Sequence, residues 1–219
     1  MATFALIHGG GSSGWDWHRV TPLLERLGHE AVAVDLPTED ADAGLDDYVR
    51  TVADAVGDRG RVIVVGHSLG GFTAPLAAEA LGADGLVYLS AMIPLPGEVF
   101  MDWWENTGHD REDVPDDPEA VYYNDVSAEL AAEARAHERD QQGTWLSEPW
   151  PGERYPDVPT MGIVCTEDRF FPPEFMRRLI RGRLGIEPVE MPGGHYAALT
   201  QPEALASLLD DFARRVGAG

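Results

Sequence analysis

The 219-residue sequence has the length of one globular domain with room for an inserted segment. Its 38 acidic residues outnumber its 16 basic ones and give a net charge of −22. A surface this negative repels phosphate backbones and anionic lipids, so we expect neither a nucleic acid partner nor membrane docking. All 16 basic residues are arginines. Without lysine, a side-chain Schiff base and a Ser-Lys dyad are excluded.

The single cysteine, Cys165, excludes an intrachain disulfide and a cysteine metal cluster. The N-terminal apolar run has no basic flank and is too short for a signal peptide. No stretch approaches the roughly 18 apolar residues of a membrane span. We therefore expect a cytoplasmic protein, monomer or homodimer, that uses no metal and no cofactor.

Six short apolar runs predict strands in chain order: 3–7, 31–34, 62–65, 84–90, 160–165 and 186–191. Segments with apolar residues at helical spacing lie among them: 18–27, 45–56, 72–81, 128–141, 172–184 and 202–216. This alternation predicts an α/β fold, a doubly wound and mostly parallel sheet of six strands with helices on both faces. We expect Pro75 to kink the helix at 72–81 and to leave the Gly71 carbonyl free.

The composition of the chain changes between the fourth and fifth predicted strands. Eight of the sixteen prolines and four of the six tryptophans lie there. Only 128–141 has clear helical periodicity, with Ser127 or Asp125 as its N-cap. A linker would not carry so many aromatic residues. We interpret 94–158 as a lid over a core formed by 1–93 and 159–219.

The strand at 62–65 is followed at once by Gly66-His67-Ser68-Leu69-Gly70. Strand, Gly-x-Ser-x-Gly turn and helix in this order are typical of a nucleophile elbow, with the serine in a strained backbone conformation. An ordinary buried turn between a strand and a helix also fits this pentapeptide. Residues elsewhere in the chain are needed to distinguish a nucleophile elbow from an ordinary turn.

A serine hydroxyl needs a base, and the base needs an orienting carboxylate. Asp168 follows the fifth predicted strand and His195 the sixth, so both lie at the carboxyl edge of the sheet with Ser68. The order Ser, Asp, His is the one that this architecture uses. We predict Ser68, Asp168 and His195 as catalytic residues. Glu167 stays an alternative acid, and either acid would also serve as a cap of the next helix.

Backbone N–H groups must stabilise the oxyanion. We expect one from Leu69 and the other from Gly10, in the glycine loop after the first strand. In that loop we interpret His8 as structural. We expect further pocket residues from the loops and the lid: Trp15, Ser90, Met92, Trp103, Trp104 and Tyr196.

Together, the motifs at residues 8–11, 66–71, 166–175 and 193–195 resemble the α/β-hydrolase superfamily. Residues 14–17 and 123–125, together with the segment around Asp168, narrow the resemblance to the small-lid group of plant methylesterases and hydroxynitrile lyases. The resemblance implies a lid after the fourth strand, the triad Ser68, Asp168 and His195, and oxyanion donors at Gly10 and Leu69. In the lyases a lysine after the catalytic histidine handles cyanide. Tyr196 stands there in this chain, which favours an esterase.

We therefore predict a serine hydrolase that cleaves carboxylic esters of small or medium apolar or aromatic molecules through an acyl-enzyme. Its partner is the small-molecule ester itself. Two alternatives remain open: a carbon–carbon bond hydrolase or thioesterase with the same triad, and a ligand receptor with negligible turnover. An epoxide hydrolase or dehalogenase would need a carboxylate in place of Ser68.

Overall fold

A computed structural model describes residues 1–109 and 117–217 of the chain. Its centre is a six-stranded parallel sheet with the order β2-β1-β3-β4-β5-β6. The strands are β1 (Thr3–Ile7), β2 (Glu30–Val34), β3 (Val62–His67), β4 (Gly85–Leu89), β5 (Thr160–Cys165) and β6 (Val189–Met191). The predicted fold class is confirmed. β6 is shorter than predicted, since Pro188 has no N–H to donate to a neighbouring strand.

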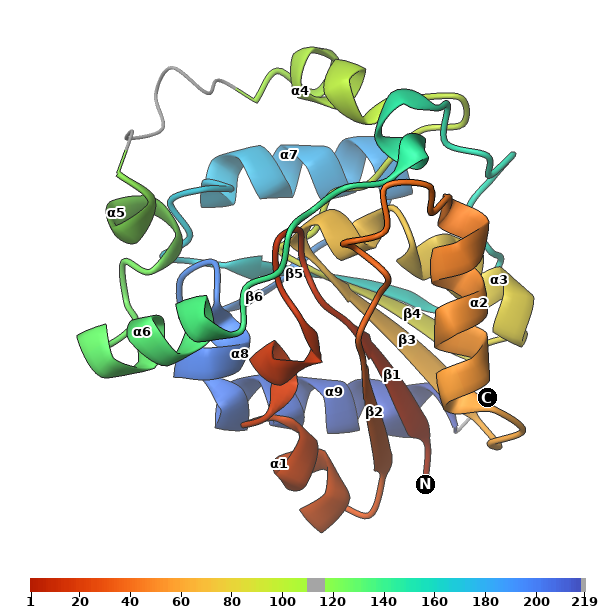
Figure 1. Cartoon of the computed structure of the whole chain (residues 1–219). Helices are drawn as coiled ribbons and strands as arrows, with labels where there is room; N and C mark the ends of the chain where they lie inside the picture. The colour runs from red at the N-terminus through yellow and green to blue at the C-terminus, as the bar shows by residue number, and fades with distance from the viewer. Residues whose placement is uncertain (110–116, 218–219) are drawn as a thin grey trace.

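Helices cover both faces of this sheet (Figure 1). One face packs against α2 (Leu45–Val56), α3 (Ala74–Leu81) and α7 (Pro173–Leu184). The other packs against α1 (Thr21–Arg26), α8 (Ala197–Thr200) and α9 (Pro202–Val216). Successive side chains of a strand point to opposite faces, so each strand contributes to both apolar layers. The carboxyl ends of the strands are thereby fixed as a rigid platform.

Two helices begin two or three residues later than predicted. The segment 18–27 is helical only from Thr21, after a 3₁₀ turn η1 (Gly14–Trp17), and the segment 72–81 only from Ala74. Pro22 and Pro75 thus lie in the first turn of their helices, where no intrahelical N–H is needed. The predicted kink at Pro75 was wrong for this reason.

Between β4 and β5 the chain forms α4 (Phe100–Thr107), α5 (Pro118–Tyr122), α6 (Ala128–Ala136) and the 3₁₀ turn η3 (Thr144–Ser147). Figure 1 shows the three α-helices as the green segment along the top and left of the molecule. Sequence periodicity missed α4 and α5. Residues 110–116 of the predicted lid lie outside the described residues.

Helix α6 ends five residues earlier than predicted. The Ser127 hydroxyl caps its start by accepting from the Leu130 N–H. At the other end, the N–H groups of Arg139 and Gln142 donate to the carbonyls of Gly11 and Thr38. These tertiary hydrogen bonds replace helical ones and bring the chain back to the loops after β1 and β2.

No helix in the described part of the chain is long and apolar enough to cross a membrane.

Gly71 shows how closely the elbow packs on the segment that follows β4. A Cβ atom there would lie 1.8 Å from the Met92 carbonyl oxygen, whereas a Cβ at Gly182, on the exposed side of α7, would meet nothing within 4 Å. We expect Gly71→Ala to lower the free energy of unfolding by roughly 3 kcal/mol, since the packed backbone has to move. Gly182→Ala should raise it by about 0.5–1 kcal/mol through helix propensity. Urea denaturation measures both, and equal effects would contradict this packing.

Candidate active site

Ser68 lies where β3 ends and a short 3₁₀ turn, η2 (Ser68–Gly71), begins. Its φ is +50°, so the strained backbone expected of a nucleophile elbow is confirmed. A Cβ at Gly66 would lie 2.7 Å from the Ala74 Cβ, and one at Gly70 would lie 2.6 Å from the His8 carbonyl oxygen. Only glycine therefore fits at positions 66 and 70, two residues before and two residues after the serine. The sharp turn holds Ser68 at the carboxyl edge of the sheet.

A chain of two hydrogen bonds joins Ser68, His195 and Asp168. The Ser68 Oγ lies 3.0 Å from His195 Nε2, and His195 Nδ1 lies 2.9 Å from Asp168 Oδ2. All three residues are buried, whereas Glu167 is exposed. Asp168 is therefore the acid that contacts the histidine, and the structure brings together the three residues that the sequence singled out.

Backbone amides hold the other oxygen of the Asp168 carboxylate. The N–H groups of Phe170 and Phe171 both donate to Asp168 Oδ1 at 2.9 Å. With Oδ1 fixed in this way, Oδ2 faces the imidazole. A His195 that donates through Nδ1–H has a free lone pair on Nε2, the atom that faces the Ser68 hydroxyl.

Aromatic rings surround the His195 imidazole. Tyr122, Phe170 and Phe171 have ring centroids 5.1–5.7 Å from it. His67 lies on another side at 4.8 Å and donates from Nε2 to the His195 carbonyl at 2.8 Å. Burial holds the pKa of His67 well below its usual value. His67 is thus a neutral packing residue.

The glycine loop after β1 lies directly against the elbow. A Cβ at Gly9 would be 3.0 Å from the Ser68 Cβ, and one at Gly10 would be 2.8 Å from the Leu69 Cδ2. Among the residues that the structure describes, the N–H groups of Gly10 and Leu69 have no acceptor. Two free amide donors beside a serine hydroxyl form the arrangement that an oxyanion hole requires.

His8 keeps this loop in place. Its Nδ1–H donates to the Gly9 carbonyl at 2.7 Å, and its Nε2 accepts from the Leu36 N–H at 3.2 Å. A protonated imidazole could not accept that second hydrogen bond. Burial lowers the pKa of His8 to about 4, which keeps the ring neutral near pH 7. The structural interpretation of His8 agrees with these contacts.

A cavity of about 830 Å³ opens above Ser68, with Gly10, Leu69 and His195 in its lining. One side of it carries apolar and aromatic side chains from α4, α5 and the loop after β5: Phe100, Trp104, Tyr122 and Phe170. We call these four residues the aromatic wall. The lining also includes exposed charged side chains: Glu39, Glu119, Arg135, Glu138 and Asp140. The cavity above Ser68 thus combines aromatic and charged side chains.

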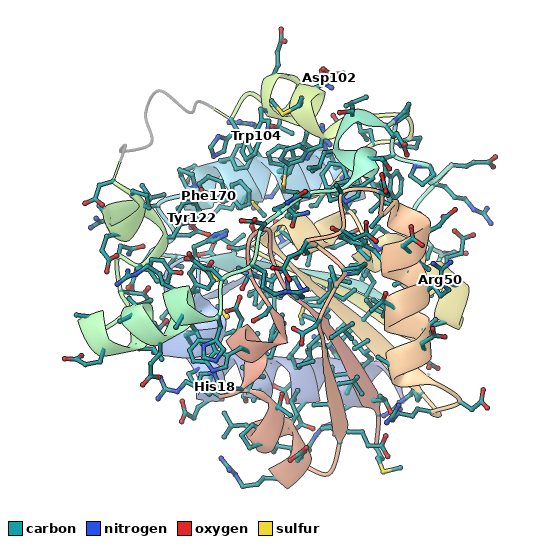
Figure 2. The ribbon with its side chains drawn as sticks, viewed as in Figure 1. His18, Arg50, Asp102, Trp104, Tyr122 and Phe170 are labelled. Carbon is teal, nitrogen blue, oxygen red and sulfur yellow. The ribbon has the colours of Figure 1, made fainter. Side chains whose placement is uncertain are left out.

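Figure 2 shows Trp104, Tyr122 and Phe170 of the aromatic wall near one another beside α7. The rings of Tyr122 and Phe170 are 4.6 Å apart, and those of Trp104 and Phe170 are 5.9 Å apart. Of these four residues, only Trp104 was predicted from the sequence to line the pocket. A signal was present, because Phe170 follows the triad acid by two residues and Phe100 precedes Trp104 by one helical turn.

Three of the predicted pocket residues, Met92, Trp104 and Tyr196, line the cavity. The prediction was wrong for Trp103, which is fully buried, donates from Nε1 to the Ile93 carbonyl and packs on Phe175. Trp103 and Trp104 are adjacent on a helix, so they point in different directions and only one reaches the cavity.

Trp15 and Ser90 also lie outside the cavity. Trp15 is stacked between His18 and His137, with centroids at 4.2 and 4.5 Å, and Figure 2 shows His18 far from the aromatic wall. Ser90 is fully buried at the end of β4 with φ +38°, and its N–H donates to the Ile163 carbonyl. Because of this turn the Met92 N–H donates to the Ser68 carbonyl at 2.9 Å. Ser90 therefore belongs to the turn whose backbone packs against the elbow and does not line the cavity.

Asp16 is a buried acid near the site that sequence reasoning passed over. Its carboxyl group accepts a hydrogen bond from the Ser12 hydroxyl, and burial raises its pKa to about 7 from an ordinary 3.8. The folded protein therefore binds more protons at Asp16 than the unfolded chain does between pH 3.8 and pH 7. This group lowers stability as the pH rises through that window.

We expect Asp16→Asn to remove this loss. Relative to the unsubstituted protein, the variant should gain stability between pH 4 and pH 8 by up to an amount on the order of 4 kcal/mol, since one pKa unit corresponds to about 1.4 kcal/mol. His8 and His67 act in the opposite direction in both proteins and cancel in the difference. Urea denaturation at several pH values measures it. Asp102→Asn, at the exposed carboxylate labelled in Figure 2, is the control, and equal pH curves for all three proteins would contradict the account.

In the part of the chain that the structure describes, no group of three His, Cys, Asp or Glu side chains has an arrangement that could hold a metal ion.

The family model described as the alpha/beta hydrolase family matches residues 4–208. Salicylic acid-binding protein 2 of Nicotiana tabacum is 28% identical over 252 residues, covering 97% of this chain and 97% of that protein. Polyneuridine aldehyde esterase of Rauvolfia serpentina is 26% identical over 250 residues, covering 95% and 94%. A crystal structure of polyneuridine aldehyde esterase superimposes with a TM-score of 0.81 at 25% identity, covering 97% of this chain and 99% of that one.

The chain therefore belongs to the α/β-hydrolase family. Within the family, its relatives include polyneuridine aldehyde esterase and plant methylesterases, the group that the motifs pointed to, and the chain is a hydrolase of the carboxylesterase kind.

Proposed function

We propose that the chain hydrolyses carboxylic esters of small or medium apolar or aromatic molecules, with Ser68 as the nucleophile. The single observation that carries the proposal is the hydrogen-bonded chain Ser68–His195–Asp168, which opens into a cavity beside two free amide donors. The esterase names of several relatives support the ester as the substrate.

In the first half of the reaction His195 Nε2 takes the proton of the Ser68 hydroxyl while Oγ attacks the ester carbonyl. The carbonyl oxygen gains negative charge, and the N–H groups of Gly10 and Leu69 donate to it. Asp168 keeps the imidazole in the tautomer that accepts this proton and stabilises the imidazolium. His195 then gives the proton to the leaving alcohol, and the acyl group stays on Ser68.

In the second half a water molecule takes the place of the alcohol. His195 removes a proton from it, the resulting hydroxide attacks the acyl-enzyme, and the carboxylic acid leaves as the proton returns to Ser68. The position after the histidine, where the lyases use lysine, carries Tyr196 here. Its ring stacks on Tyr123 at 4.9 Å, and its pKa is raised far above the usual value, chiefly by burial. A neutral phenol there gives no cation to a cyanide leaving group.

We propose further that residues 94–158 act as a lid on a core made of 1–93 and 159–219. Phe100 and Trp104 come from α4, Tyr122 from α5, and Arg135 from α6, and all four line the cavity. The aromatic wall then selects an aromatic or branched apolar group on one side of the scissile bond.

A substrate panel tests this function. We expect hydrolysis of p-nitrophenyl acetate and higher kcat/KM for benzyl and phenyl esters, since a ring buried against the aromatic wall adds apolar contact. Faster turnover of a matched thioester or a β-diketone would instead make the chain a thioesterase or a carbon–carbon bond hydrolase. Saturable binding of the aromatic esters without any turnover would make it a receptor.

A further inference from the structure

The turn between α5 and α6 contacts the loop that carries His195. Asp125 Oδ2 accepts from the Gly194 N–H at 2.8 Å and from the Thr200 hydroxyl at 2.7 Å. Gly194 directly precedes His195, and Thr200 ends α8, the short helix that follows it. Figure 1 shows α6 next to α8, although some 70 residues separate them in sequence. One oxygen of the Asp125 carboxylate therefore binds the chain on both sides of His195, at Gly194 and at Thr200.

The neighbouring residue contacts the loop that carries the triad acid. The Asn124 side-chain amide donates from Nδ2 to the Glu167 carbonyl at 3.1 Å, and Glu167 directly precedes Asp168. The two triad loops are also joined to each other, since the Glu167 N–H donates to the Gly193 carbonyl at 3.0 Å. Asn124 and Asp125 thus flank the hydrogen bond that connects the two loops.

Close packing supports these hydrogen bonds. A Cβ at Gly194 would lie 2.4 Å from Asp125 Oδ1 and 2.9 Å from Asn124 Oδ1. The side chains of Asn124 and Asp125 therefore pack directly against the backbone of Gly194, next to His195. A displacement of the turn is therefore passed to the Gly194 backbone through the short Asp125 side chain.

We propose that Asp125, with Asn124 beside it, is a positioning residue that aligns His195 with Ser68 and Asp168. The proposal rests on the function proposed above. It also couples the segment between β4 and β5 to the reaction, because the imidazole is aligned only while the turn between α5 and α6 is seated. A misplacement of about 1 Å in a catalytic group can cost roughly 10²-fold in rate.

The two residues differ in their expected effect. The Asp168 carboxylate is held independently by the N–H groups of Phe170 and Phe171. Losing the Asn124 contact therefore leaves the acid in place. Without the Asp125 carboxylate, the Gly194 N–H and the Thr200 hydroxyl both lose their acceptor next to the catalytic base.

The kinetic test uses full-length variants and an ester that the unsubstituted protein hydrolyses rapidly. We expect Asp125→Ala to lower kcat about 10–100-fold with KM changed less than about 3-fold. Asp125→Asn retains an acceptor oxygen and should recover most of the rate, while Asn124→Ala should lose less than about 5-fold. Ser127→Ala is the matched control, because it removes the N-cap of α6, two residues away, and touches neither triad loop. It should lower Tm by about 2–4 °C and leave kcat unchanged.

Nuclear magnetic resonance separates this proposal from the proposed function. The His195 Nδ1–H, held by Asp168, should give a far-downfield proton signal that His195→Ala abolishes. We expect the signal in the unsubstituted protein, in Asp125→Asn and in Ser127→Ala, and its loss or a clear shift in Asp125→Ala. If the unsubstituted protein were inactive on esters but the downfield signals still followed this pattern, the proposed esterase function would be wrong. The positioning role of Asp125 would then still be supported. An unchanged signal and rate in Asp125→Ala, or an equal loss of rate in Ser127→Ala, would overturn the positioning role.

Discussion

Replacing Ser68 with alanine is expected to lower kcat for p-nitrophenyl esters by roughly four to six orders of magnitude, with the fold intact. The Ser68 Oγ is the nucleophile in the proposed mechanism, and it lies 3.0 Å from the only base placed to take its proton among the described residues. KM should change little, because the aromatic wall and the free amides of Gly10 and Leu69 stay in place. Steady-state kinetics with circular dichroism as a check on folding measures this effect.

Ser207 supplies a matched control. It is exposed on α9, on the face of the sheet away from the cavity, so Ser207→Ala should keep the full rate. If the Ser68→Ala protein retained more than a few per cent of the activity, another group would be the nucleophile and the proposed mechanism would fail.

Asp168→Asn is expected to lower kcat by about 10⁴-fold. The asparagine Oδ1 can still accept from the amides of Phe170 and Phe171, so its NH₂ group then faces His195 in place of Oδ2. An NH₂ group cannot accept from Nδ1–H, and the imidazole turns to the tautomer that carries its proton on Nε2. That tautomer cannot take the Ser68 proton.

The neighbouring acid tests this assignment directly. Glu167 is exposed, so Glu167→Gln should leave kcat unchanged. Activity measured from pH 6 to pH 10 should show a partial recovery of the Asp168→Asn variant at alkaline pH, where hydroxide can act without the histidine. A larger loss in Glu167→Gln than in Asp168→Asn would reverse the choice between the two acids.

Local patterns were sufficient to predict the sheet and the triad. Each strand is a short apolar run, and parallel strands place their carboxyl ends at one edge, so Ser68, Asp168 and His195 had to come close once the alternation of strands and helices was recognised. Gly66 and Gly70 carried a second signal, because such a sharp turn leaves no room for a side chain at positions 66 and 70.

The cavity could not be predicted in the same way, because it depends on tertiary packing. Trp103 and Trp104 are identical residue types next to each other, and only the rotation of α4 decides that Trp103 enters the core and Trp104 the aromatic wall. Periodicity also missed α4 and α5, which have eight and five residues. The contacts of Asp125 join residues about 70 positions apart, and nothing in the sequence alone marks that pair.

Ser68 is the activated nucleophile in the proposed mechanism. Reaction of the full-length protein with a fluorophosphonate, followed by mass mapping of the adduct, tests this role. We predict one adduct per chain, on Ser68, which the His195→Ala variant forms at least about 100-fold more slowly because the base is gone. Labelling of another residue, or equal labelling of Ser68 without His195, would contradict the account.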